Sequence, residues 1–231
     1  MIRQRWRDLL FVHWALPAAA VRPLVPAELE LDRLDGRAWV TLIPFLIAES
    51  RPAWLPRALS SAFLETNLRT YVRGPDGDPG IYFFSLEAAS VAAVLAARAG
   101  YALPYFPAAM SRRVAGDRIE YTSRRRVGPP AALDVAWRIG PAVGGAGAGR
   151  PDHFLVERYT LYVMRGHRLY RGRVRHTPYP LHRVTVERLS ESLRAAAGLP
   201  AGTEPALCHH SPGVDVEIFA LERAEARAGA A

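Results

Sequence analysis

Polar side chains suited to acid–base chemistry alternate along residues 65–73, which read ETNLRTYVR. Glu65, Asn67 and Arg69 occupy every second position, so a β-strand would place a carboxylate, an amide and a guanidinium on one face. On an outer face such a row is ordinary, because charged residues are mostly exposed. On an inner face the three would surround a cavity, where burial raises and an arginine lowers the pKa of a carboxyl. Glu65 is the candidate acid or base, and Asn67 and Arg69 are candidate ligand-binding residues.

Two histidines are further candidates for ligand binding. His13 lies inside the apolar stretch LLFVHWAL, where a lone histidine is more often a hydrogen-bonded structural residue than a catalytic one. His176 begins HTPYP, in which Pro178 and Pro180 restrict the backbone beside it. A plain loop role and a binding role are about equally supported for His176.

Metal and cofactor chemistry have little support in the sequence. Cys208, His209 and His210 are consecutive, and neighbouring strand residues point to opposite faces, so the three cannot readily bind one ion. The chain contains no GxSxG, Walker or GxGxxG motif. We therefore expect no metal site and no cofactor.

Composition predicts one globular domain spanning residues 1–231. Half of the residues are apolar and 23% are charged, which is typical of a folded domain. All 30 basic residues are arginine, so no side-chain amine can form a Schiff base.

The single cysteine fits a reducing compartment. The apolar N-terminal stretch is too short for a membrane span, so we expect a cytoplasmic protein without membrane contact.

The formal charge of +8 raises nucleic acid as an alternative partner. Arg124, Arg125 and Arg126 form the longest basic run, but their side chains must alternate in direction on a strand. Few aromatic residues are interspersed with these arginines. A solvated hairpin is the favoured interpretation, and we expect no specific nucleic-acid binding.

Hydrophobic periodicity predicts about ten strands and a few short helices. Helices are expected within residues 17–26, 90–100, 151–158 and 190–198, a flexible surface loop at 140–149, and a frayed tail at 221–231. The absence of a βαβ rhythm indicates a mainly β (α+β) fold with an antiparallel sheet. Closing that sheet into a barrel would create an interior. The Glu65 row is predicted to face it, at least at Glu65 and Asn67, with the opposite row packed beneath the helices at 17–26 and 90–100.

Several stretches resemble the YqjF-like family (DUF2071), a domain of unknown function. They are RWRDLLFVHWALPAAAVRPLVP, LELDRLDGRAWVTLIPF, SAFLETNLRTYVRGPDGDPGIYFFSLEA, ALPYFPAAMS, HFLVERYTLY, LYRGRVRHTPYPL and the late leucine-rich stretch near GLPAG. The resemblance covers nearly the whole chain, from Trp6 to about Pro212. That family is similar in fold to the acetoacetate decarboxylase-like superfamily. The resemblance implies a single antiparallel β-barrel of that type, with a few short covering helices around a small-molecule cavity.

The same resemblance suggests roles for residues near Arg98. Arg98 would bind the negative end of a ligand, while Tyr105 and Phe106 would line the cavity. The segment 98–110 lacks the reactive lysine of that superfamily, so Schiff-base decarboxylation cannot be carried over. The leading expectation is a protein that binds a small carboxylate- or carbonyl-bearing molecule. A lysine-independent lyase or hydrolase-like enzyme using Glu65 and an arginine-rich nucleic-acid-binding barrel are the alternatives; the sequence is also compatible with a homo-oligomer.

Overall fold

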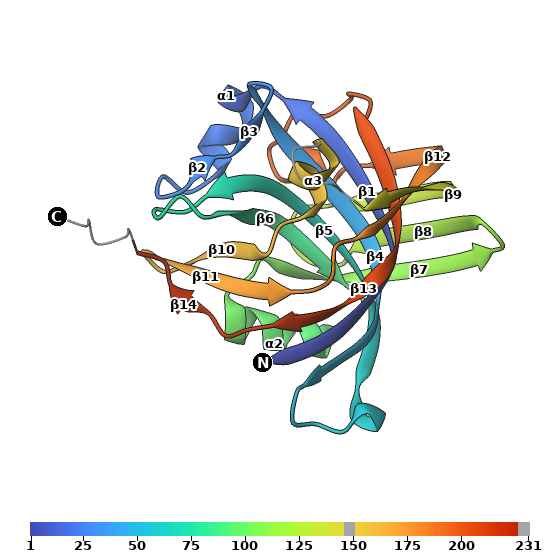
Figure 1. Ribbon diagram of the computed structural model, residues 1–231, viewed down its shortest axis with the longest axis horizontal. Coiled ribbons are helices and arrows are strands. Elements are labelled where there is room, and N and C mark those ends of the chain that lie inside the picture. The colour runs from blue at the N-terminus through green and yellow to red at the C-terminus, as the bar shows by residue number, and fades with distance from the viewer. Residues whose placement is uncertain (146–150, 226–231) are drawn as a thin grey trace.

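The computed structural model describes residues 1–145 and 151–225. Most of them form strands, with a few short helices between (Figure 1). None of the helices in this part of the chain combines the length and apolar character that crossing a bilayer requires. Part of the expected loop at 140–149 and most of the expected tail at 221–231 lie outside the described residues.

The strands of the described residues join a single sheet. They are β1 (Ile2–Leu16), β2 (Glu30–Leu31), β3 (Arg33–Leu34), β4 (Arg37–Pro52), β5 (Ser61–Arg73), β6 (Pro79–Ala88), β7 (Tyr105–Ala115), β8 (Arg118–Arg125), β9 (Ala132–Gly145), β10 (Thr160–Arg165), β11 (Arg168–Arg175), β12 (Pro180–Glu191), β13 (Leu207–Ile218) and β14 (Glu222–Arg223). The helices are α1 (Ala18–Val21), α2 (Val91–Tyr101), α3 (Pro151–Val156) and α4 (Leu193–Ala196), with short 3-10 turns η1 (Arg22–Leu24) and η2 (Arg57–Leu59).

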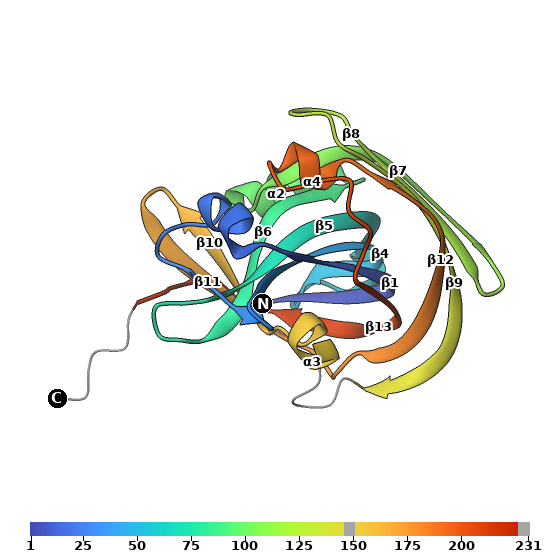
Figure 2. The ribbon, with the colours of Figure 1, turned by 90° about the horizontal axis from the view of Figure 1, so that it is seen from above.

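The order of strand pairing returns to its starting strand. From β6 it runs through β7, β8, β9, β12, β13, β1, β4 and β5, and β5 then pairs with β6. A second, shorter circuit passes from β6 through β10 and β11 to β13. Figure 2 shows how strongly the sheet curves, with β7, β8, β9 and β12 bending away from β1, β4 and β5. The central strands are therefore flanked on both faces.

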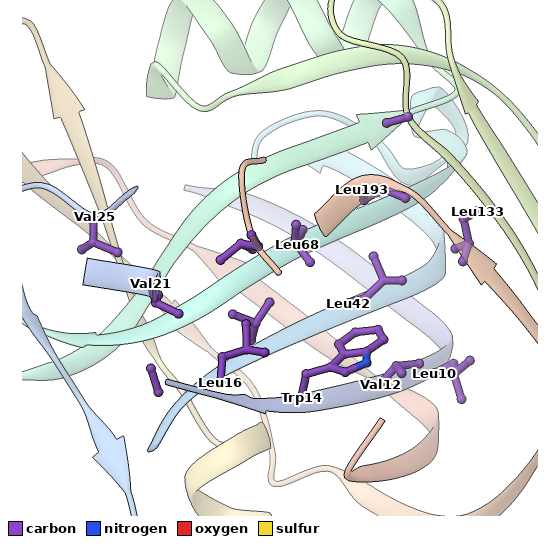
Figure 3. Packing of buried hydrophobic residues seen from close by; sticks show 14 of the residues in the cluster. Leu10, Val12, Trp14, Leu16, Val21, Val25, Leu42, Leu68, Leu133 and Leu193 are labelled. Atoms are coloured by element: carbon purple, nitrogen blue, oxygen red, sulfur yellow. The ribbon is translucent and has the colours of Figure 1, made fainter. Parts of the chain in front are cut away.

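Buried apolar side chains accordingly form two clusters, one on each face of β1, β4 and β5. In β1, Leu10, Val12 and Trp14 belong to one cluster, whereas Leu9 and Phe11 belong to the other. Figure 3 shows the first cluster, in which Leu68 of β5 meets side chains from the far part of the sheet and from α4. Strict alternation on a strand produces this division, and nearly continuous apolar runs such as LLFV are its sequence signature.

Four details differ from the sequence-based expectations. Residues 140–145 continue β9 because they pair with β12, so they are no loop. Glu222 and Arg223 form β14 against β11, so the tail is ordered at its start. The sheet is not wholly antiparallel, since β6 pairs in parallel with both β7 and β10. Of the two helices expected beneath the Leu68 row, α1 packs with that cluster, whereas residues of α2 line the cavity beside the opposite cluster.

Candidate functional site

A cavity of about 210 Å³ lies on the Glu65 face of β5. Its wall is mainly apolar and comes from many strands and from α2, including Leu9, Ile43, Phe45, Phe63, Ile81, Phe83, Leu86, Ala93, Ala97, Leu103 and Leu161. The volume is many times the space that one water needs, so it can hold a small organic molecule. Glu65, Asn67 and Arg69 all line this cavity, and each is 4–6% exposed.

Glu65 is held at the cavity wall by a tyrosine. The hydroxyl of Tyr105 donates to Oε2 of Glu65 over 2.7 Å. The pKa of Glu65 is raised to about 7. Burial is the main cause and the nearby Glu87 carboxylate adds to it, whereas hydrogen bonds from Tyr105 and Asn67 lower the pKa. Burial also raises the pKa of Tyr105, with the Glu65 charge contributing. Near neutral pH the Glu65 carboxyl can therefore either donate or accept a proton.

Arg69 brings a positive charge into the same cavity without a carboxylate partner in the described part of the chain. Its Nη2 donates to the backbone oxygen of Leu155 at 3.2 Å. Its Nε is buried and has no hydrogen-bond partner among residues 1–145 and 151–225. Arg158, the other arginine at the wall, is paired with Asp32 at 2.7 Å. A buried guanidinium without a counterion is costly, and an anionic ligand would relieve that cost.

His13 is fully buried but does not line this cavity. Its Nδ1 lies 2.8 Å from Oγ1 of Thr41, which lies 2.5 Å from the Tyr71 hydroxyl. Tyr71 donates its only proton to the Leu155 carbonyl, so Thr41 must donate to Tyr71 and accept from Nδ1–H of His13. This chain fixes the tautomer of His13. Burial lowers the pKa of His13 well below its usual value, with His209 and Arg69 adding to the effect.

His176, a candidate ligand-binding residue, does not lie at the cavity that Glu65 lines. It lines a second, arginine-rich depression together with Arg3, Arg5, Arg51, Arg57 and Arg175, and it does not line the first cavity. Its ring packs 4.7 Å from the rings of both Tyr159 and Tyr179. Tyr179, fixed between two prolines, does line the first cavity. The prolines therefore position the tyrosine beside the cavity rather than the histidine.

Arg98 and Phe106 also lie away from the cavity wall. Arg98 is exposed on α2 and its Nε donates to the Tyr105 carbonyl at 2.7 Å. Tyr105 and Phe106 are neighbours on β7, so only one can face the cavity, and it is Tyr105. Phe106 stacks under the Arg125 guanidinium, 3.9 Å from its ring centre. Arg98, the expected anchor for a negative group, therefore does not line this cavity, whereas Arg69 does.

The basic run at 124–126 is divided between different surroundings. Arg124 and Arg126 are exposed, whereas the Arg125 side chain is 3% exposed and forms an ion pair with Glu87, which is 1% exposed. Burial raises the pKa of Glu87, and its bonds to Arg125 oppose that shift. The three arginines therefore do not form one continuous surface for a nucleic-acid backbone.

Sequence reasoning missed Arg158 and Tyr179 at the cavity wall. Arg158 lies in the connection between α3 and β10, and Tyr179 lies in the connection between β11 and β12. Neither connection has a regular pattern from which to predict whether the side chain faces the cavity. Cys208, His209 and His210 are consecutive on β13, so the two histidines point to opposite faces of the sheet. His209 lies near Asp152 and His13. His210 lies near Trp137 and His182. Only the long-range pairing of strands reveals these neighbours.

Comparison with known proteins gives a matching family, a sequence relative and more distant structural relatives. The model of the family DUF2071, described as an uncharacterized conserved protein, matches residues 3–215. The uncharacterized protein YqjF of Bacillus subtilis (strain 168) is 38% identical over 224 residues, covering 96% of this chain and 92% of that protein.

The solved structures that match are related in fold. An acetoacetate decarboxylase-like enzyme from Sphingomonas wittichii RW1 has a TM-score of 0.66 at 15% identity, covering 97% of this chain and 93% of its own. Acetoacetate decarboxylase from Legionella pneumophila gives 0.66 at 13%, covering 97% and 87%. The enduracididine biosynthesis enzyme MppR complexed with pyruvate gives 0.66 at 12%, covering 96% and 90%. At such identities the likeness shows the fold alone.

Proposed function

Since the chain belongs to the DUF2071 family of uncharacterized conserved proteins, we propose its function from the cavity: it binds a small organic acid whose carboxylate is held by Arg69. The observation that carries the proposal is the buried guanidinium of Arg69, whose Nε lacks a partner among the described residues. A carboxylate supplies both the missing charge and the missing acceptor. The apolar wall suits the remainder of a short carbon chain.

The proposed architecture is a β-barrel of the acetoacetate decarboxylase-like type with the ligand inside. Two findings support it: the closed order of strand pairing and the likeness to solved structures of that fold. One of those structures holds pyruvate, a small carboxylate, which is the same class of ligand. We also propose a cytoplasmic location, consistent with the single cysteine.

Binding is tested with the Arg69→Gln variant. Ligand-observed NMR and titration calorimetry with butanoate and 2-oxobutanoate should detect binding to the parent and a loss of at least about tenfold in the variant, as for a buried charge-assisted contact. Arg113→Gln, which removes an equally charged but exposed side chain on β7, is the matched control and should bind like the parent. Equal binding by the parent and Arg69→Gln, or no binding of any acid, would contradict the proposal.

An acid–base enzyme acting on the bound acid is the second candidate. It is favoured by the pKa of Glu65, about 7, and by the Tyr105 hydroxyl at 2.7 Å, because a group that titrates near the working pH is an efficient proton donor and acceptor. The acids that bind would be followed by proton NMR in D2O for conversion or for loss of C–H signals. Parent activity that disappears in Glu65→Gln would support the enzyme, whereas unchanged ligand with the parent would leave a binding protein.

A further inference from the structure

Two residues that line the cavity, Asn67 and Arg69, each carry a buried polar atom without a partner among the described residues, and the two atoms are of opposite kinds. Nε of Arg69 is a hydrogen-bond donor and Oδ1 of Asn67 is an acceptor; neither has a partner within residues 1–145 and 151–225. Both side chains are 6% exposed, and a buried polar atom left unpaired is costly. A ligand that satisfies both must present an acceptor to Arg69 and a donor to Asn67.

The orientation of the Asn67 amide follows from its neighbour Glu65. The Asn67 side chain forms a hydrogen bond that lowers the pKa of Glu65, so the bond favours the ionised carboxylate. A carboxylate only accepts hydrogen bonds, so the Asn67 NH2 group must be the donor. Oδ1 is then the atom left for a ligand. Asn67 is also the single asparagine of the chain.

The donor required by Oδ1 is better supplied by a hydroxyl than by an ammonium group. The charge of Arg158 is balanced by Asp32, but Arg69 has no carboxylate partner among the described residues, so a positively charged group beside Arg69 would be repelled unless Glu65 is ionised. A hydroxyl is neutral and can donate to Oδ1 in either protonation state of Glu65. A ketone at the same place presents only an acceptor, which would face the Asn67 oxygen without a hydrogen bond. An unsubstituted carbon chain would leave that oxygen unpaired.

We propose that the cavity selects short hydroxy acids, with the carboxylate on Arg69 and a hydroxyl donating to Oδ1 of Asn67. Alternate residues of a strand are about 6.6 Å apart, which suits a hydroxyl on the second or third carbon. The preference should be stereospecific, because Arg69, Asn67 and the apolar wall together contact the ligand at more than two points. This inference rests on the proposed function and names the substrate class of the same site.

The test compares four-carbon acids that differ in one group. Titration calorimetry at pH 8, where Glu65 is mainly ionised, would use butanoate, 2-oxobutanoate and the separate enantiomers of 2- and 3-hydroxybutanoate. At least one hydroxy acid enantiomer should bind about tenfold or more tightly than butanoate and 2-oxobutanoate, since one hydrogen bond to an otherwise unpaired group is gained. Equal or tighter binding of 2-oxobutanoate or butanoate would overturn the inference.

A variant separates this inference from the proposed function. Asn67→Leu has a similar volume and removes Oδ1; it should reduce the preference for the hydroxy acid over butanoate to about twofold or less. A preference that survives in Asn67→Leu would also overturn the inference. If the acids bind through Arg69 without any preference, only the hydroxy-acid inference fails. If none binds, or if Arg69→Gln binds them equally, the proposed function fails.

Discussion

Glu65, Asn67 and Arg69 show how three residues acquire different properties on one face of one strand. Glu65 is buried beside a tyrosine, and the pKa of its carboxyl rises to about 7. Arg69, four residues on, contacts a backbone carbonyl instead of a carboxylate. With Asn67 between them, the row has a proton-exchanging end and a cationic end. Such polarity favours one orientation of a ligand over the reverse.

Glu65→Gln should change how stability depends on pH. The pKa of Glu65 is raised from 4.5 to about 7, so the folded state holds the proton more tightly than the unfolded state. Its contribution to stability is therefore greatest below pH 4.5 and is lost as pH rises towards 7. Glutamine does not titrate, so the variant does not lose stability in this way. The free energy of unfolding of the variant minus that of the parent should therefore increase between pH 5 and pH 8 by on the order of 3 kcal/mol. Urea unfolding at a series of pH values measures the difference; a constant difference would contradict it.

His13 should remain neutral and keep its proton on Nδ1. The chain from His13 through Thr41 and Tyr71 to the Leu155 carbonyl allows only that tautomer, and burial lowers the pKa of the ring. Nitrogen-15 NMR of the histidine rings should show the Nδ1–H form for His13 unchanged from pH 8 to pH 5.5. A His13 signal that changes to another form over this pH range would refute the assignment.

At the scale of elements, a buried ion pair between Glu87 of β6 and Arg125 of β8 links these two strands. Arg125 contacts Glu87 through Nε at 3.1 Å and through Nη2, and Phe106 covers the guanidinium. Breaking such a pair leaves one buried charge without compensation, which is far more damaging than replacing both partners. The pair therefore matters for how the curved sheet closes over the Leu68 cluster.

Arg125→Met should destabilise the fold by about 3–5 kcal/mol at pH 7. Burial already raises the pKa of Glu87, and loss of the arginine should raise that pKa further. The destabilisation should therefore decrease as the pH falls towards 5 and Glu87 becomes protonated. Combining the change with Glu87→Gln should recover most of the loss. Arg124→Met, at an exposed neighbouring position, is the control and should be nearly neutral. Denaturant unfolding of the four proteins provides the measurement.

Strand alternation made much of the site predictable and explains where prediction failed. It placed Glu65, Asn67 and Arg69 on one face, although it could not say whether that face was buried. Local pattern could not reveal that α2 turns Arg98 to solvent, or that Tyr105 rather than Phe106 faces inward, because both depend on packing between distant segments. The pairing of residues 140–145 with β12 was missed for the same reason, since its glycines give a loop-like composition.

At the scale of the whole molecule, the absence of lysine decides which covalent chemistry is available. The similar folds include acetoacetate decarboxylases, yet no side chain here carries an amine. The amino group of Met1 is the remaining amine, and its neighbour Ile2 lines the cavity, so the terminal amine requires its own control.

Treatment with 3-oxobutanoate and borohydride should leave every side chain unmodified. Intact-mass and peptide mass spectrometry would detect a reduced adduct, and comparison with an N-terminally acetylated sample would identify reaction at Met1. An adduct on any internal peptide would refute this prediction.

Strand β5 separates a packed interior from an open one, because Leu68 faces the first cluster and Asn67 and Arg69 face the cavity. Substitutions at the cavity positions change no contact of the Leu68 row directly. Evolution, or a designer, can therefore alter ligand preference at positions 65, 67 and 69 at modest cost to folding, provided that no buried charge is left uncompensated. A diverse set of ligands across related sequences is the outcome that this separation favours.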